Sequence, residues 1–116
     1  MVERRRHKRH SVDLPCRIAW EDGQTSGRIS NVSLGGALIV KAEAVPSRRA
    51  PVCITFEWEG QRIQLDAEVV FTVDHAKWGA EKELGAGLFS VKFSASIDEV
   101  RKTLAPFLEG LATESV

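Results

Sequence analysis

Two short groups of residues carry side chains suited to binding an anion. The first is the run RRRHKR at residues 4–9, in which Arg5 and Arg9 form an RxxxR pattern directly preceded by Arg4. The planar guanidinium group of arginine pairs bidentately with phosphate or with guanine O6 and N7, and its face stacks on a base. In an extended segment, residues four apart point the same way and lie about 13 Å apart. Arg5 and Arg9 can therefore hold opposite ends of one compact ligand, or converge on it if the segment curls.

The second group is the pattern NxSxxG, formed by Asn31, Ser33 and Gly36. The Asn31 amide and the Ser33 hydroxyl can hydrogen-bond to base edges, to phosphate or to an arginine. Gly36 would let a ligand approach the backbone, or would permit a positive φ that other residues resist. The alternative interpretation is a simple turn between strands, because Asn, Ser and Gly are common turn formers.

The charge of the chain is unevenly distributed although its net value is zero. Residues 1–10 hold five basic side chains and one acidic side chain, a net charge of +4, whereas the remainder holds 11 basic and 15 acidic side chains, a net charge of −4. A basic N-terminal arm on an acidic body predicts an anionic ligand that meets the N-terminus. The alternatives are a solvated tail and an arm that contacts nucleic acid.

Other chemistry has little support in the sequence. His7 and His10 lie three residues apart without a further His or Cys cluster, so we expect no metal site. Cys16 and Cys53 belong to no CxxC pair, and we expect both to be reduced and buried in the core. No set of residues resembles a nucleophile with its activating base, so we predict no catalytic residues and no enzyme activity.

No membrane insertion or export is expected. No apolar run approaches the roughly 20 residues that cross a bilayer. The first ten residues have no apolar segment after their basic cluster, so they do not match a secretory signal. We therefore predict a cytoplasmic location.

The elements that must position these groups are mainly strands. Apolar residues alternate with polar ones in a period of two, typical of strands with one buried face, and the six predicted strands are residues 12–20, 24–30, 36–40, 52–58, 63–71 and 89–93. Pro15 lacks a backbone N–H, so the first strand should be an edge strand or only partly paired. The alternation places Trp20, Trp58 and Phe71 on buried faces. Trp78, in a polar loop, is the exposed aromatic candidate for a partner surface.

A helix is predicted at the C-terminal end. Residues 96–99 (SIDE) form a capping box, and apolar residues follow at helical spacing as far as Leu111. Pro106 should kink this helix or end its regular part near Ala105, and Gly110 is a plausible stop. We predict a flexible basic arm at 1–11, a barrel with its helix at 12–111 and a disordered tail at 112–116. The fold class is mainly β: a six-stranded antiparallel, Greek-key-like small β-barrel with a C-terminal α-helix over one end or rim.

The two motifs, in this order and separation, resemble the two signatures of the PilZ family of cyclic di-GMP receptors. The stretch GAGLFSVKF at residues 85–93 also resembles a late strand of that family, and the likeness runs from about Glu3 to Gly110. The resemblance implies that cyclic di-GMP is the ligand and that the binding positions are Arg5, Arg9, Asn31, Ser33 and Gly36. In this family, an arginine at the place of Arg4 tends to accompany two ligand molecules per chain.

The sequence therefore predicts a cyclic di-GMP receptor or adaptor without a cofactor, which orders its arm on binding and signals to a protein effector. We expect a monomer that binds no nucleic acid. One alternative is a small-barrel nucleic-acid-binding protein that uses the basic arm, but the aromatics lie in phase with the apolar faces and the body is acidic. The other is a PilZ-like interaction protein that has lost the messenger, which the two intact motifs disfavour.

Overall fold

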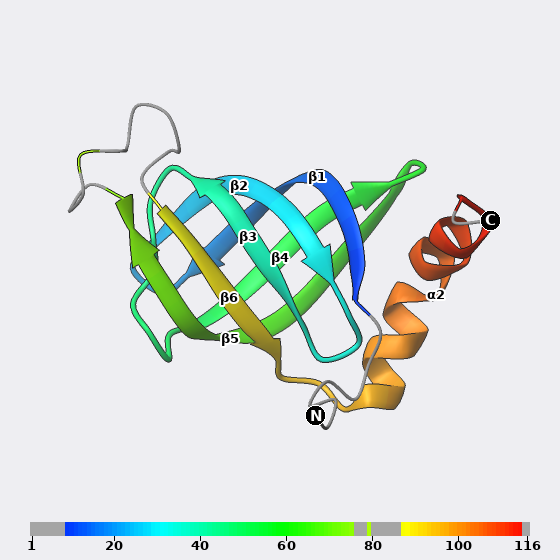
Figure 1. Cartoon of the computed structure of the whole chain (residues 1–116). Helices are drawn as coiled ribbons and strands as arrows, with labels where there is room; N and C mark the ends of the chain where they lie inside the picture. Colours follow the sequence, from blue (N-terminus) through cyan, green and yellow to red (C-terminus); the bar gives the residue numbers. More distant parts are fainter. Residues whose placement is uncertain (1–8, 76–78, 80–86, 115–116) are drawn as a thin grey trace, which may run out of the picture.

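Alternating strands curl into a closed barrel, followed by a single helix (Figure 1). The computed structural model describes residues 9–75, 79 and 87–114. Its elements are β1 (His10–Trp20), β2 (Gly23–Val32), β3 (Gly36–Ala42), β4 (Pro51–Trp58), β5 (Gln61–Asp74), β6 (Gly87–Phe93) and α2 (Ile97–Glu114). All pairings are antiparallel, in the order β1-β2-β3-β6-β5-β4, with β4 returning to β1. The predicted fold class is confirmed, and every predicted strand is present with slightly wider bounds.

The core fills the barrel interior because alternate residues of each strand point inward. Three α2 side chains, Val100, Leu104 and Phe107, complete it with no exposed surface. The largest fully buried strand side chains are Phe89, Ile18, Ile29, Ile39, Ile54, Val32 and Val69.

The barrel is weakest where β1 meets β4. These strands pair only from Arg17 to Ala19 on β1, whereas β1 pairs with β2 along most of its length. Pro15 lies just before that short pairing, so the predicted partial pairing of the first strand is confirmed. Because β4 has no residue paired with position 15, the absence of an N–H in Pro15 removes no hydrogen bond between β1 and β4.

Helix α2 begins at the predicted cap. The Glu99 N–H donates to Ser96 Oγ at 3.3 Å, and the Val100 N–H donates to the Ser96 carbonyl at 2.9 Å. The predicted stop at Gly110 is wrong, since α2 continues through Pro106 and past Gly110 to Glu114. At Pro106, the burial of Leu104 and Phe107 on either side of the proline outweighs its local breaking signal.

Helix α2 packs on Phe56 and Trp58 of β4, two aromatic residues that follow the part of β4 paired with β1. The Phe107 ring meets Phe56 edge-on at 5.4 Å and Trp58 at 5.0 Å between ring centroids. Both geometries are favourable for aromatic pairs. Helix α2 therefore covers the barrel where β1 and β4 separate.

Several predicted placements need correction. Both thiols are free and Cys16 is buried as predicted, but Cys53 is half-buried, because it lies between the inward-facing Val52 and Ile54. Trp20 and Trp58 are only partly buried against the core. Trp78 lies outside the described residues.

Among the described helical residues, no stretch is both long and apolar enough to span a bilayer.

Candidate functional site

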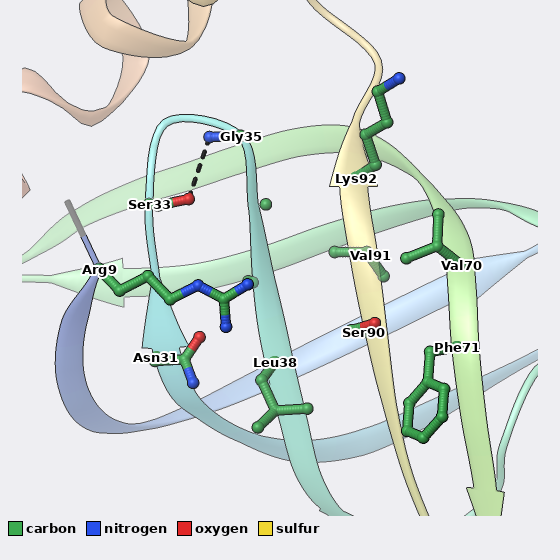
Figure 2. Close-up of a pocket in the computed structure, with 12 residues that line it drawn as sticks. Arg9, Asn31, Ser33, Gly35, Leu38, Val70, Phe71, Ser90, Val91 and Lys92 are labelled. Atoms are coloured by element: carbon green, nitrogen blue, oxygen red, sulfur yellow. Dashed lines mark hydrogen bonds between the residues drawn. The ribbon is translucent and has the colours of Figure 1, made fainter. Parts of the chain in front are cut away.

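A pocket of about 420 Å³ lies on the outer face of the barrel, over β2, β3, β6 and β5 (Figure 2). Residues of both sequence motifs line it, together with residues that the motifs do not include. The lining residues are Arg9, Asn31, Ser33, Gly35, Gly36, Ala37, Leu38, Val70, Phe71, Ser90, Val91 and Lys92.

One row of cross-strand neighbours crosses the pocket. Asn31 pairs with Leu38, Leu38 with Ser90, and Ser90 with Phe71. Directly opposed residues of adjacent strands lie about 4.5–5.5 Å apart at Cβ. The row therefore presents, in order, an amide, an aliphatic side chain, a hydroxyl and an aromatic ring.

Two β-bulges shape the walls of this pocket. On β3 and β6 a single outward residue separates two buried ones, whereas on β2 both Ser30 and Asn31 lie between the buried Ile29 and Val32. On β5 the extra residue makes Val70 and Phe71 both face outward, with exposed fractions of 41% and 54%. Bulges bend a strand and increase its twist. The flanking strands β2 and β5 therefore form walls around a floor made by β3 and β6.

The exposure of Phe71 corrects the predicted placement. The alternation that buries Val69 would bury Phe71 as well, but the bulge at Val70 reverses the phase. The sequence did contain a signal, because Val69, Val70 and Phe71 form an apolar triplet that interrupts the polar–apolar alternation. The motifs also gave no indication of Leu38, Ser90 and Lys92 as pocket residues.

The turn between β2 and β3 orients Ser33. The Ser33 N–H donates to the Gly36 carbonyl at 2.8 Å, and the Gly35 N–H donates to Ser33 Oγ at 3.1 Å. Because Ser33 Oγ accepts in this second bond, its own hydroxyl hydrogen remains able to donate. The turn interpretation and the binding interpretation of the motif are therefore compatible.

Gly36 has a packing reason that the sequence did not reveal. A Cβ at this position would lie 2.1 Å from the Val91 carbonyl oxygen of β6, and the Gly36 φ is not in the positive range. The positive-φ explanation for this glycine is therefore wrong. The close approach of the two backbones, which only glycine permits, forms part of the pocket floor.

Arg9 is the one arm residue of the RxxxR motif within the described part of the chain, and it is exposed at the pocket. Figure 2 shows its side chain reaching over the pocket, near Asn31. Arg4 and Arg5 lie outside the described residues.

The described lining favours a negative charge. It includes two cations, Arg9 and Lys92, and no carboxylate. Lys92 is directly opposite Glu68 on β5, and in Figure 2 its side chain points away from Arg9. No group of three or more potential metal ligands occurs among the described residues. The arrangement can bind an anion that also offers a flat or apolar surface to Phe71 and Leu38.

The fold and the site define a small β-barrel domain with a pocket on its outer face whose described lining holds two cations and no carboxylate. A family model described as PilZ domain matches residues 3–110, and the chain belongs to this family. PilZ domains are in general ligand-binding receptors and not enzymes. An uncharacterized protein from Aquifex aeolicus (strain VF5) is 30% identical over 74 residues, which are 64% of this chain and 36% of that protein. The chain thus spans about a third of the length of that relative.

Solved structures show the same fold. The PilZ domain of YcgR from Escherichia coli with c-di-GMP is 20% identical, with a TM-score of 0.72 and coverage of 97% of this chain and 95% of that chain. The PilZ domain of CeSA from a cellulose synthesizing bacterium is also 20% identical, with a TM-score of 0.65 and coverage of 90% and 98%. The Bacillus subtilis inhibitor of motility MotI/DgrA is 16% identical, with a TM-score of 0.67 and coverage of 97% and 53%.

Proposed function

We propose that this chain is a receptor for cyclic di-GMP. The observation that carries the proposal is that Arg9 from the first motif and Asn31, Ser33 and Gly36 from the second, distant in sequence, line one pocket. The PilZ domain of YcgR, whose structure contains c-di-GMP, shares the fold and supports the choice of ligand. We also infer that binding occurs without catalysis.

The side chains of the pocket match the chemistry of this ligand, which has two phosphodiester anions and two guanines. The Arg9 guanidinium can pair with a phosphate or with guanine O6 and N7. The Ser33 hydroxyl and the Asn31 amide, which line the same pocket, can provide further hydrogen bonds to the ligand. The Phe71 ring, 54% exposed, offers a face on which a base can stack.

Arg4 and Arg5 complete the site in this proposal. Arg5 makes the second guanidinium contact of the RxxxR motif, and Arg4 adds the cationic and stacking capacity for a second messenger molecule. Calorimetry should then give about two ligands per chain, and about one for Arg4→Leu. A stoichiometry of one in the unmodified protein would show that Arg4 does not recruit a second molecule.

We further propose that the part of the predicted arm before β1, residues 1–9, becomes ordered when the messenger binds, and that this change is recognised by a protein effector. His10 and Ser11, which the sequence assigned to the arm, are paired residues of β1. Ordering a residue costs roughly 1–2 kcal/mol of backbone entropy, and the messenger would offset it through several charge-assisted hydrogen bonds. Order parameters of residues 3–9 should rise from below about 0.6 to about 0.85 on ligand addition. An arm that is already rigid without ligand would exclude this mechanism.

Titration of the purified protein by calorimetry tests the central proposal. Cyclic di-GMP should bind, whereas cyclic di-AMP and GTP serve as specificity controls. Arg9→Ala should weaken binding about ten- to hundredfold, because it removes a charge-assisted contact of roughly 1.5–3 kcal/mol, while the unfolding temperature stays the same. No binding to the unmodified protein, or unchanged affinity in Arg9→Ala, would contradict the assignment.

The remaining expectations are tested alongside. Random oligonucleotides should not bind appreciably at about 150 mM salt, and any binding through phosphates would weaken steeply with added salt. Light scattering should report a monomer. The cytoplasmic location stays a prediction.

A further inference from the structure

The pair Asp13–Arg28 joins β1 to β2 and is not among the residues that line the pocket. The Arg28 Nε–H donates to the Asp13 carboxylate, and Arg28 Nη2 donates to the Asp13 backbone carbonyl at 3.3 Å. One guanidinium thus binds both the side chain and the main chain of the same residue. Hydrogen bonding to Arg28 also lowers the pKa of Asp13, so its carboxylate is charged at neutral pH.

The pair lies at an irregularity in the β1–β2 ladder. Leu14 is opposite Ile29 and Ser11 is opposite Asn31, so β1 has one residue more than β2 over this interval. Val12 and Asp13 have no β2 partner in the register of the described strands. The second hydrogen bond of Arg28 therefore reaches a carbonyl group within the interrupted part of the ladder.

This irregularity determines where Arg9 lies. With it, Ser11 is opposite Asn31, and Arg9, the residue immediately before β1, lies at the pocket. Without it, continuation of the Leu14–Ile29 register would bring Val12 opposite Asn31, and Arg9 would lie one residue, about 3.4 Å, further from Asn31 along β2. The alternation of inward and outward side chains on β1 is the same on both sides of the irregularity, so the irregularity sets the position of Arg9 along the ladder and not its face.

Resting on the proposed function, we infer that Asp13 and Arg28 form a clamp that holds the β1 bulge and so positions Arg9 for the messenger. Both hydrogen bonds of Arg28 go to Asp13, which lies within the bulge. The residues before the bulge then pass Asn31, with Ser11 directly opposite it. Both side chains are exposed, at 77% for Asp13 and 39% for Arg28. Exposed ion pairs contribute little to stability, so the inference predicts an effect on the position of Arg9 and little effect on unfolding.

Asp13→Ala distinguishes this positioning role from simple electrostatics. Removing a negative charge near a dianion should strengthen binding if charge alone matters, whereas loss of the clamp should weaken it. We expect the affinity for cyclic di-GMP to fall by about five- to tenfold. This loss is smaller than the one expected for Arg9→Ala, because Arg9 is displaced and not removed. The unfolding temperature should shift by less than about 5 °C. Unchanged or increased affinity would overturn the inference.

A double-mutant cycle tests whether Asp13 acts through Arg9. In the Arg9→Ala background, Asp13→Ala should change the affinity by less than about twofold, because the residue that it positions is gone. Full additivity of the two effects would overturn the inference. Asp13→Asn, which keeps an acceptor for Arg28, replaces the alanine variant if that variant does not fold and should show a smaller loss. Glu57→Ala, on a strand that does not line the pocket, is the charge control and should bind normally.

NMR of the ligand-free protein separates this inference from the proposed function. Loss of the clamp should lower the amide order parameters of His10 and Ser11 from about 0.85 toward 0.6, whether or not the messenger binds. Unchanged order parameters in Asp13→Ala would show that no clamp exists, even in a protein that binds cyclic di-GMP. Failure of the unmodified protein to bind would instead refute the proposed function.

Discussion

Substitution of Gly36 by alanine should affect both stability and binding. The new Cβ would lie 2.1 Å from the Val91 carbonyl oxygen, and the next atoms of β6 would be 3.2 and 3.4 Å away. The obstacle is backbone, so no side-chain rotation relieves the collision. Strands β3 and β6 must move apart at the floor of the pocket.

The expected cost follows from two contributions. Overpacking of a closely fitted site costs about 1–3 kcal/mol. The neighbouring hydrogen bond from the Phe93 N–H to the Gly35 carbonyl, 3.0 Å long, contributes about 1 kcal/mol if it is lost. A total of about 2–4 kcal/mol should lower the unfolding temperature by about 10 °C or more in a domain of this size.

Thermal unfolding followed by circular dichroism measures this change, and calorimetry with cyclic di-GMP measures binding. Gly23→Ala is the matched control, because the nearest atoms to its new Cβ are in the Trp20 side chain at 3.1–3.3 Å. That ring can shift, and the loss of chain entropy in the unfolded state favours alanine by about 0.4–1 kcal/mol. An unfolding temperature for Gly36→Ala equal to that of Gly23→Ala would refute the close-approach argument.

Three further outcomes are expected. Phe71→Ala should weaken cyclic di-GMP binding by about 1–3 kcal/mol for a stacked base while leaving thermal stability unchanged, since the ring is 54% exposed; calorimetry with unaltered affinity would exclude stacking. Phe107→Ala should destabilise the fold by about 3–5 kcal/mol in chemical denaturation, because its fully buried ring packs on Phe56 and Trp58; a loss under about 1 kcal/mol would show that α2 is not part of the core. Burial raises the pKa of Cys16 from 9.0 to about 11, so the unfolded state loses this proton first and stability should fall between these two pH values by at most about 3 kcal/mol. Cys16→Val should lack that part of the alkaline decline, and identical pH profiles for the two proteins would contradict the assignment.

Strand positions and the fold class could be predicted from sequence because a strand buried on one face has a local signature of period two. Ile63, Leu65, Ala67 and Val69 are all buried, as their alternation predicted. The same holds for the Ser96 cap of α2, whose acceptor and donor are three residues apart. Such features depend on neighbours in the chain, and therefore local pattern is sufficient to find them.

The motif residues of the site were also accessible from sequence, since each motif places its functional groups within a few residues. Arg9, Asn31, Ser33 and Gly36 do meet in one pocket. Their chemical types alone indicate an anionic ligand, because guanidinium, amide and hydroxyl groups all hydrogen-bond to phosphate oxygens. The reason for Gly36 was inaccessible, because it depends on the carbonyl oxygen of Val91 on a distant strand.

Contacts between strands decided the face that Phe71 takes, whereas Leu38, Ser90 and Lys92 face outward as the alternation of their strands predicts. Closing six strands into a barrel requires strong coiling, and the bulges on β2 and β5 supply it. The bulge at Val70 turns Phe71 outward, against the phase of its own strand, and thereby adds an aromatic wall opposite Asn31. Likewise, Pro106 does not end α2, because Leu104 and Phe107 on either side of it are buried in the core. Local pattern thus determined the type of each element and the chemistry of the motifs, whereas contacts between distant strands decided the direction of the side chains around them.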